Sequence, residues 1–160
     1  MEKVMKVVLR LSNYFSVVAE VTLSLMMLIT VSDVILRAFN RPILGAYEVV
    51  SFFGAVAMGF SAPITSWMRG HVNVDIVTSK LPKKARNIVN IGTRCLVIAL
   101  FLLLSWRLAV YGMNLQRASE VSMTLRLPFY PIAYGLAVAC LLQSVVVCCD
   151  ILKIRGGRYE

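Results

Sequence analysis

Four long apolar segments alternate with polar stretches along the chain, at residues 12–36, 47–68, 88–111 and 128–149. Each segment has the roughly 20 residues that a helix needs to cross a hydrocarbon core about 30 Å thick. The longest polar connection is the middle one, and none of the connections is large enough for a soluble domain. The pattern predicts an all-α integral membrane protein in which residues 1–160 form a single membrane domain with four transmembrane helices.

Two of these helices should be longer than the membrane is thick. Helical patterning runs without Pro or Gly from about Val4 to Ala38, and from Pro82 to about Arg117 only two glycines interrupt it. At about 1.5 Å per residue, each helix would exceed roughly 50 Å. Such helices tilt or project beyond the bilayer. We therefore expect two long, tilted helices and two shorter ones.

Composition agrees with a membrane protein, since 59% of the residues are hydrophobic and the mean hydropathy is +0.77. The first apolar segment begins too late and runs too long for a signal peptide, and no small-residue cleavage site follows it. We interpret it as a retained span.

The formal net charge of +9 raises the question of nucleic-acid binding, but the placement of the basic residues answers it. Most of them flank the spans on one side, which by the positive-inside rule puts both termini and the middle loop in the cytoplasm. The charge thus reflects topology, and we expect no nucleic-acid partner. The basic residues on the predicted cytoplasmic side are Lys3, Lys6, Arg10, Arg69, Lys80, Lys83, Lys84, Arg86, Lys153, Arg155 and Arg158.

The four cysteines, Cys95, Cys140, Cys148 and Cys149, lie inside spans or at the cytoplasmic end of the last one. No Cys-x-x-Cys motif occurs, and the predicted outer loops contain no cysteine. A disulfide framework or a membrane thiol oxidoreductase would need cysteines at the oxidising face. We interpret these residues as small apolar fillers.

Small residues recur at intervals of four in two of the spans. Ser51, Ala55 and Gly59 have this spacing in the second segment, and Ala133 and Ala137 have it in the fourth. Small side chains at this spacing let helix backbones approach closely in lipid. We therefore expect close approach of helix backbones at these residues, without a particular partner helix.

Glu20 is the first polar residue with possible chemistry, because it lies well inside the first span. An ionisable side chain at that depth indicates either function or a polar contact between helices. One interpretation is a carboxylate that couples transport to protons or cations. The other is an ion pair with Arg94, which lies about as deep in the third span, and we expect this Glu20–Arg94 pair.

Further charges gather near the outer ends of the spans. Asp33 and Arg37 are four residues apart, the spacing of an ion pair on one helix face. Glu48 opens the second span near the same level, and Arg107 lies near the outer end of the third. We expect these residues to form a network at the outer rim.

His71, the single histidine, lies in the middle loop with Asp75 four residues on. A zinc site needs more ligands than these two. A haem-binding anchor would need histidines inside the spans, and a nucleophile–base site would need a hydroxyl held against the ring. We expect no metal, no cofactor and no catalysis here. Asp75 instead suits the N-cap of a short surface helix that leads to Pro82, with His71 at the headgroups.

Three sequence pieces occur in one order at distinctive spacing: RAFN at Arg37–Asn40, Gly-Ala-x-Glu at Gly45–Glu48, and GHVNVD at Gly70–Asp75. A Leu-Pro step follows them. Together with the predicted four-span layout, they resemble the small membrane subunit of tripartite ATP-independent periplasmic (TRAP) transporters, the DctQ-like family. The likeness covers essentially the whole chain.

The resemblance implies a three-part importer of an organic acid such as a dicarboxylate or sialic acid. A periplasmic (DctP-like) protein binds the substrate, and a large (DctM-like) membrane subunit moves it by using the sodium gradient. The small subunit has no transport pathway; it braces the large one and contacts membrane lipids. By this likeness Arg37, Asn40, Glu48, His71 and Asp75 have structural or interface roles, and none is catalytic.

Two other functions remain open from the residues alone. The first is a self-sufficient small transporter that uses Glu20 as its proton-coupled site. The second is a membrane-anchor subunit of a redox enzyme, which would bind haem or quinone.

Overall fold

The computed structural model describes residues 2–68 and 83–155, and within them the side chains of residues 5–68 and 92–151. The helices are α1 (Glu2–Ala38), α2 (Ala46–Trp67), α4 (Lys83–Ala118) and α5 (Tyr130–Arg155). Each is long and apolar enough to cross a membrane. Within these ranges the only β-type pairing is an isolated bridge between Val121 and Pro128. The predicted all-helical architecture with four such helices is confirmed.

Helix lengths also agree with the sequence pattern. The two long helices, α1 and α4, have 37 and 36 residues, whereas α2 and α5 have 22 and 26. At about 1.5 Å per residue, α1 is about 55 Å long. This exceeds the thickness of a hydrocarbon core. The tilt of these helices relative to a membrane stays a prediction, as does the orientation of the termini.

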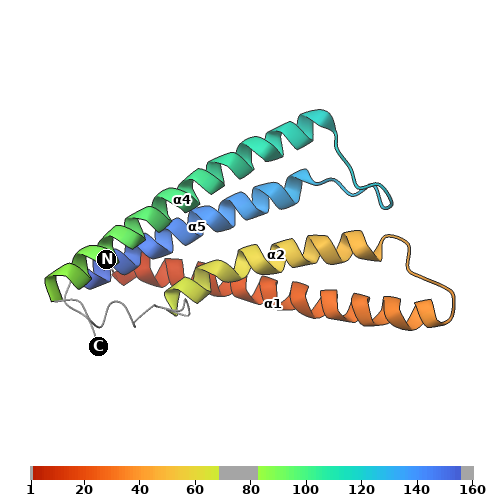
Figure 1. Cartoon of the computed structure of the whole chain (residues 1–160), viewed down its shortest axis with the longest axis horizontal. Helices are drawn as coiled ribbons and strands as arrows, with labels where there is room; N and C mark the ends of the chain where they lie inside the picture. Colours follow the sequence, from red (N-terminus) through yellow and green to blue (C-terminus); the bar gives the residue numbers. More distant parts are fainter. Residues whose placement is uncertain (1, 69–82, 156–160) are drawn as a thin grey trace.

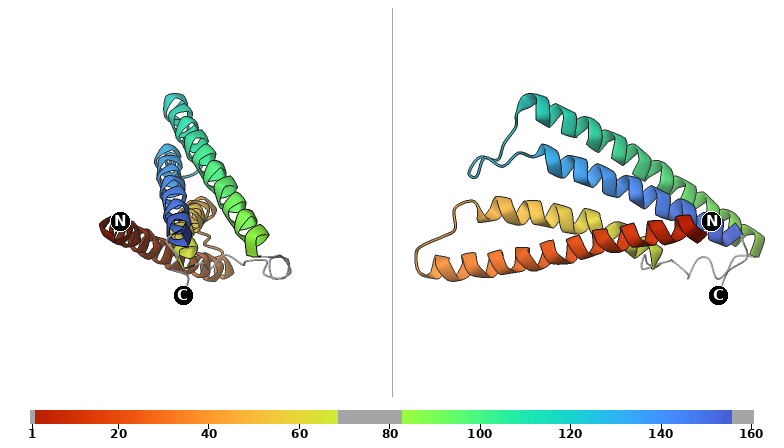
Figure 2. Two further views of the ribbon diagram at one scale, coloured as in Figure 1. Left: turned by 90° about the vertical axis from the view of Figure 1, so that its left-hand side faces the viewer. Right: turned by 180° about the vertical axis from the view of Figure 1, so that it is seen from behind.

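The helices pack in the order α1, α2, α5, α4, so that the two shorter helices form the centre and the two long ones the flanks (Figure 1). We call the end that holds residues 39–45 and 119–129 the loop end. The opposite end, with the first residues of α1 and the last of α5, is the terminal end. The helices converge at the terminal end, and α1 and α4 are farthest apart at the loop end (Figure 2).

The central pair, α2 and α5, runs in parallel from the loop end to the terminal end. Contacts along this pair recur every seven residues: Phe52 with Phe129, which directly precedes α5, Gly59 with Leu136, and Ser66 with Gln143. A seven-residue repeat keeps one seam of each helix facing the other, as in a coiled coil. This seam joins the α1–α2 hairpin to the α4–α5 hairpin.

Small residues make the close contacts in the interior. Leu136 fills the space that a Cβ at Gly59 would occupy, and Ala133 and Ala137 are buried. Ser51 is exposed, and its hydroxyl donates to the carbonyl of Tyr47 in its own helix. Close approach at a small residue, as the spacing indicates, is therefore present at Gly59, where the neighbour is α5, while Ser51 lies outside this contact.

Each hairpin has its own internal contacts. In α4–α5, the hydroxyl of Ser105 donates to the carbonyl oxygen of Ala137 at 2.8 Å, and Gly112 lies against the ring of Tyr134. In α1–α2, the rings of Phe15 and Phe60 have centroids 4.6 Å apart. The middle-loop prediction, a surface helix with His71 and Asp75, lies outside the described residues.

Candidate functional site

The turn that ends α1 is a Schellman motif, and it explains why an asparagine suits position 40. The Arg41 N–H donates to the carbonyl of Leu36, and the Asn40 N–H donates to that of Arg37. This pattern places the residue after the C-cap in the left-handed region. Asn40 has a φ of 56°. Asparagine tolerates this conformation better than most residues with a side chain.

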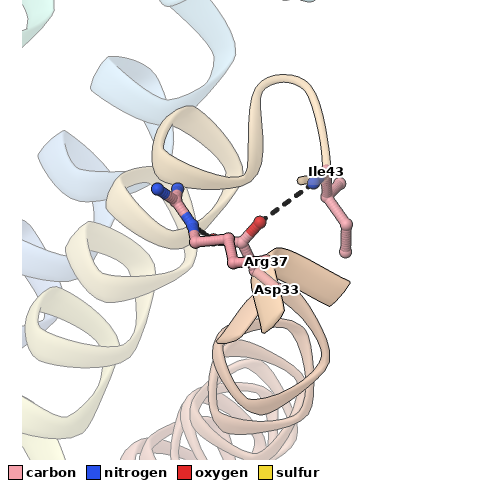
Figure 3. Close-up of polar contacts among 3 residues, drawn as sticks. All are labelled: Asp33, Arg37 and Ile43. Carbon is pink, nitrogen blue, oxygen red and sulfur yellow. Dashed lines mark hydrogen bonds and ion pairs between the residues drawn. The ribbon is translucent and has the colours of Figure 1, made fainter. Parts of the chain in front are cut away.

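Asp33 fixes the chain that follows this turn (Figure 3). One carboxylate oxygen accepts the Arg37 Nε–H at 2.7 Å, and the other accepts the Ile43 N–H at 3.0 Å. Asp33 is buried, while the Arg37 side chain is mostly exposed. The predicted Asp33–Arg37 pair is confirmed, and its carboxylate also holds the α1–α2 connection.

A second carboxylate joins the two hairpins at the loop end. The hydroxyl of Ser122 donates to Oε2 of Glu48, the Thr124 N–H donates to Oε1 at 2.9 Å, and the Leu125 N–H donates to Oε2 at 3.1 Å. Gly45 has a φ of 79°, and a Cβ there would lie 2.6 Å from Cγ of Leu125. We call these five residues the loop clasp.

The loop clasp replaces the rim network that the charges suggested. Glu48 binds the 119–129 connection and not a cation of the rim. Arg107 lines a shallow groove on α4 with Tyr111 and Asn114, and it forms no ion pair with any residue in the described part of the chain. The rim prediction is therefore right for Asp33 and Arg37 and wrong for Arg107.

Near the terminal end, Arg94 and Asp150 form the ion pair between α4 and α5, with Nη2 and Oδ2 2.9 Å apart. Their side chains are 23% and 20% exposed. Glu20 lies elsewhere, on the exposed side of α1, where the Ser16 hydroxyl donates to Oε1 at 2.9 Å. The expected Glu20–Arg94 pair does not form in this structure, because α5 supplies a carboxylate on the helix next to α4.

Gln143 lies almost fully buried between α5 and α2, and its amide Nε2 donates to the hydroxyl of Ser66. Close by, Val8, Val146 and Cys149 form a buried apolar cluster against which Trp67 packs. Among the residues that the structure describes, no group of three or more His, Cys, Asp or Glu side chains is placed to hold a metal. The Arg94–Asp150 and Gln143–Ser66 contacts near this end join neighbouring helices.

Asp150, Ser122 and Leu125 make contacts that the pattern of apolar segments does not indicate. A usable signal exists for Asp150. Neighbouring helices joined by a short loop run antiparallel, so moving back along α4 corresponds to moving forward along α5. Arg94 lies 24 residues before the end of α4, which corresponds to about residue 154 of α5, and Asp150, one turn away, is the carboxylate of that helix. No comparable local signal exists for the loop clasp.

The fold defines a multi-pass membrane protein in which the motif residues that the structure describes, Arg37, Asn40 and Glu48, lie at the loop end. The family model for tripartite ATP-independent periplasmic transporters, DctQ component, matches residues 26–156. This range covers most of the 160 residues, so the chain belongs to the DctQ family and is a component of a tripartite transporter. The resemblance seen in the sequence is confirmed. No curated protein matches the chain.

Proposed function

We propose that this protein is the small permease subunit that braces the large (DctM-like) membrane subunit of a TRAP transporter. The transporter would take up an organic acid, such as a dicarboxylate or sialic acid, with a periplasmic (DctP-like) binding protein and the sodium gradient. The subunit would be a single domain of the inner membrane with both termini in the cytoplasm, and it would catalyse no reaction.

The observation that carries this proposal is the uneven burial of the helices. In the most apolar 18-residue stretch of each helix, 6% of the residues are buried in α1 and 11% in α4, against 17% in α2 and 50% in α5, the two central helices. The flanking helices thus present long apolar faces outward. Within a family of transporter components, such faces suit contact with a larger membrane subunit and with lipid.

The loop clasp adds rigidity to this frame. A subunit that braces a larger one has to keep its own shape, so its two hairpins should not rotate freely about the α2–α5 seam. Glu48 binds main-chain N–H groups of the opposite hairpin, and charge-assisted hydrogen bonds of this kind are stronger than neutral ones. The two hairpins are therefore connected at the loop end as well as along the α2–α5 seam.

Co-expression with the large subunit tests the proposal. We expect an affinity-tagged large subunit to retain the small subunit through purification, and uptake in proteoliposomes to require both subunits and the binding protein. If the large subunit purifies alone and transports at full rate without this chain, the proposal fails.

Proteoliposomes that contain only this chain test the other functions. Proton-coupled flux that is lost in Glu20→Gln would establish a self-sufficient transporter. A haem absorption band in the purified protein would instead indicate a redox anchor. We expect neither result.

A further inference from the structure

Glu20 lies inside the hydrocarbon core wherever α1 is placed in the membrane. The apolar span in α1 runs from Met5 to Ala38, and Glu20 is about 22 Å from its start and about 27 Å from its end at 1.5 Å per residue. A core about 30 Å thick placed anywhere along this span includes Glu20. Tilting the helix lengthens the included segment and does not remove Glu20 from it.

At this depth the carboxylate faces away from the protein interior. Glu20 is exposed and borders an open groove of about 570 Å³ between α1 and α2. The groove is mostly apolar; its lining includes Leu23, Met26, Gly54, Ala57 and Met58. Ionisable residues inside membranes almost always face the bundle interior or a water-filled cavity. The position of Glu20 is therefore unusual for an isolated subunit.

The described part of the chain gives this carboxylate a single donor, the Ser16 hydroxyl, and no cation. Ser61 and Thr65 also line the groove, but their hydroxyls donate to the carbonyls of Met58 and Ser61 in their own helix. Arg94 is paired with Asp150 on the far side of the central helices. A cation for Glu20 has to come from outside the described residues.

We infer that the groove beside Glu20 receives a membrane-spanning helix of the large subunit, with a lysine or arginine at the depth of Glu20. This inference rests on the proposed function. A helix is the element that satisfies its own main-chain groups in lipid. Gly54 and Ala57 allow its backbone to approach closely. The cation supplies the charge that the groove lacks.

A second copy of this chain suits the groove less well. A two-fold contact brings the same patch of both subunits together. It would therefore place two Glu20 carboxylates in one apolar contact, and like charges repel.

Co-purification with a tagged large subunit tests the inference with three variants. Glu20→Gln removes the charge at nearly constant shape. Met58→Trp fills the groove from an 81% exposed position, and Met27→Trp is the matched control, 63% exposed on α1 and absent from the groove lining. We expect Glu20→Gln and Met58→Trp to lower the retained small subunit at least fivefold and Met27→Trp to leave it unchanged. Thermal unfolding of each purified variant alone should match the wild type.

The outcomes separate this inference from the proposed function. If the wild type is not retained by the large subunit, the proposed function fails and the inference with it. If the wild type is retained and Glu20→Gln is retained equally, only the inference is overturned. A cross-linked homodimer of the small subunit that depends on Glu20 would also overturn it.

A charge exchange gives the positive test. Glu20→Lys should abolish retention, and changing one lysine or arginine in a span of the large subunit to glutamate should restore it at least in part. If no such change among the basic residues of those spans restores retention, the assigned partner is wrong.

Discussion

The loop end and the terminal end join the same two hairpins by different physical means. At the terminal end the helices converge, and side chains from three helices pack around Val146, which is fully buried. At the loop end the flanking helices are farthest apart, and a glutamate binds the main chain of a connection more than 70 residues away in sequence.

The difference shows what each kind of contact can do. Apolar packing needs surfaces in direct contact over many atoms. A carboxylate that accepts hydrogen bonds from a loop can connect elements whose helices have already separated. Loss of packing should therefore weaken the whole bundle, whereas loss of the loop clasp should open one region before the rest.

The largest effect is expected along the seam that both ends share. In Gly59→Leu the new side chain competes with Leu136 for one space, and overpacking of this kind costs roughly 1–3 kcal/mol. We expect the free energy of unfolding in detergent, measured by titration with a denaturing detergent, to fall by about that amount. The control is Gly92→Leu, because no atom lies within 4 Å of a Cβ there. Equal losses of unfolding free energy in both variants would contradict the close contact between Gly59 and Leu136 in the seam.

A smaller global effect should follow from breaking the ion pair near the terminal end. Arg94→Ala removes a partly buried ion pair between α4 and α5, and we expect a loss of about 2 kcal/mol, the scale of a hydrogen bond to a charged group. A double-mutant cycle gives the sharper measurement. Arg94→Ala and Asp150→Ala should be non-additive, whereas Arg94→Ala and Glu20→Gln should be additive. Coupling between Arg94 and Glu20 would show that the structure pairs the wrong carboxylate.

Opening of the loop clasp should be local. In Glu48→Ala the amides of Thr124 and Leu125 lose their acceptor, so we expect their hydrogen exchange to accelerate at least tenfold. Glu48→Gln, which keeps one acceptor oxygen, should give an intermediate rate. Glu120→Ala is the matched control, an exposed carboxylate in the same connection. If exchange along α2 and α5 accelerates as much as in the loop, the two ends are one cooperative unit and the comparison fails.

The smallest effect concerns the turns that begin the two connections. Ser119 at the end of α4 makes the same Schellman contacts as Asn40 and has a φ of 53°. Glycine adopts this conformation without steric cost. Ser119→Gly should therefore raise the free energy of unfolding by about 0.5 kcal/mol, measured as a slightly higher thermal midpoint. Asn40→Gly should give a smaller gain, because asparagine already tolerates the conformation. A gain at Asn40 larger than at Ser119 would contradict this explanation.

The sequence by itself determined the four helices, their unequal lengths, the Asp33–Arg37 pair and the family. These features depend on contacts within a few residues, on the length of each apolar run and on motif spacing, all of which are local in the chain. Close packing at Gly59 was also predictable, because small residues at intervals of four are typical of helix–helix contacts in membranes.

Only the tertiary structure decided which charged side chains of different helices and connections meet. Arg94 reaches Asp150 and not Glu20 because α5 is the helix beside α4, and Glu48 reaches Ser122 because the 119–129 connection folds back onto the start of α2. The order of helices in a bundle is a sum of many weak contacts distant in sequence. The apolar pattern around a single carboxylate says little about that order, so the choice between Asp150 and Glu20 as the partner of Arg94 is made when the helices pack.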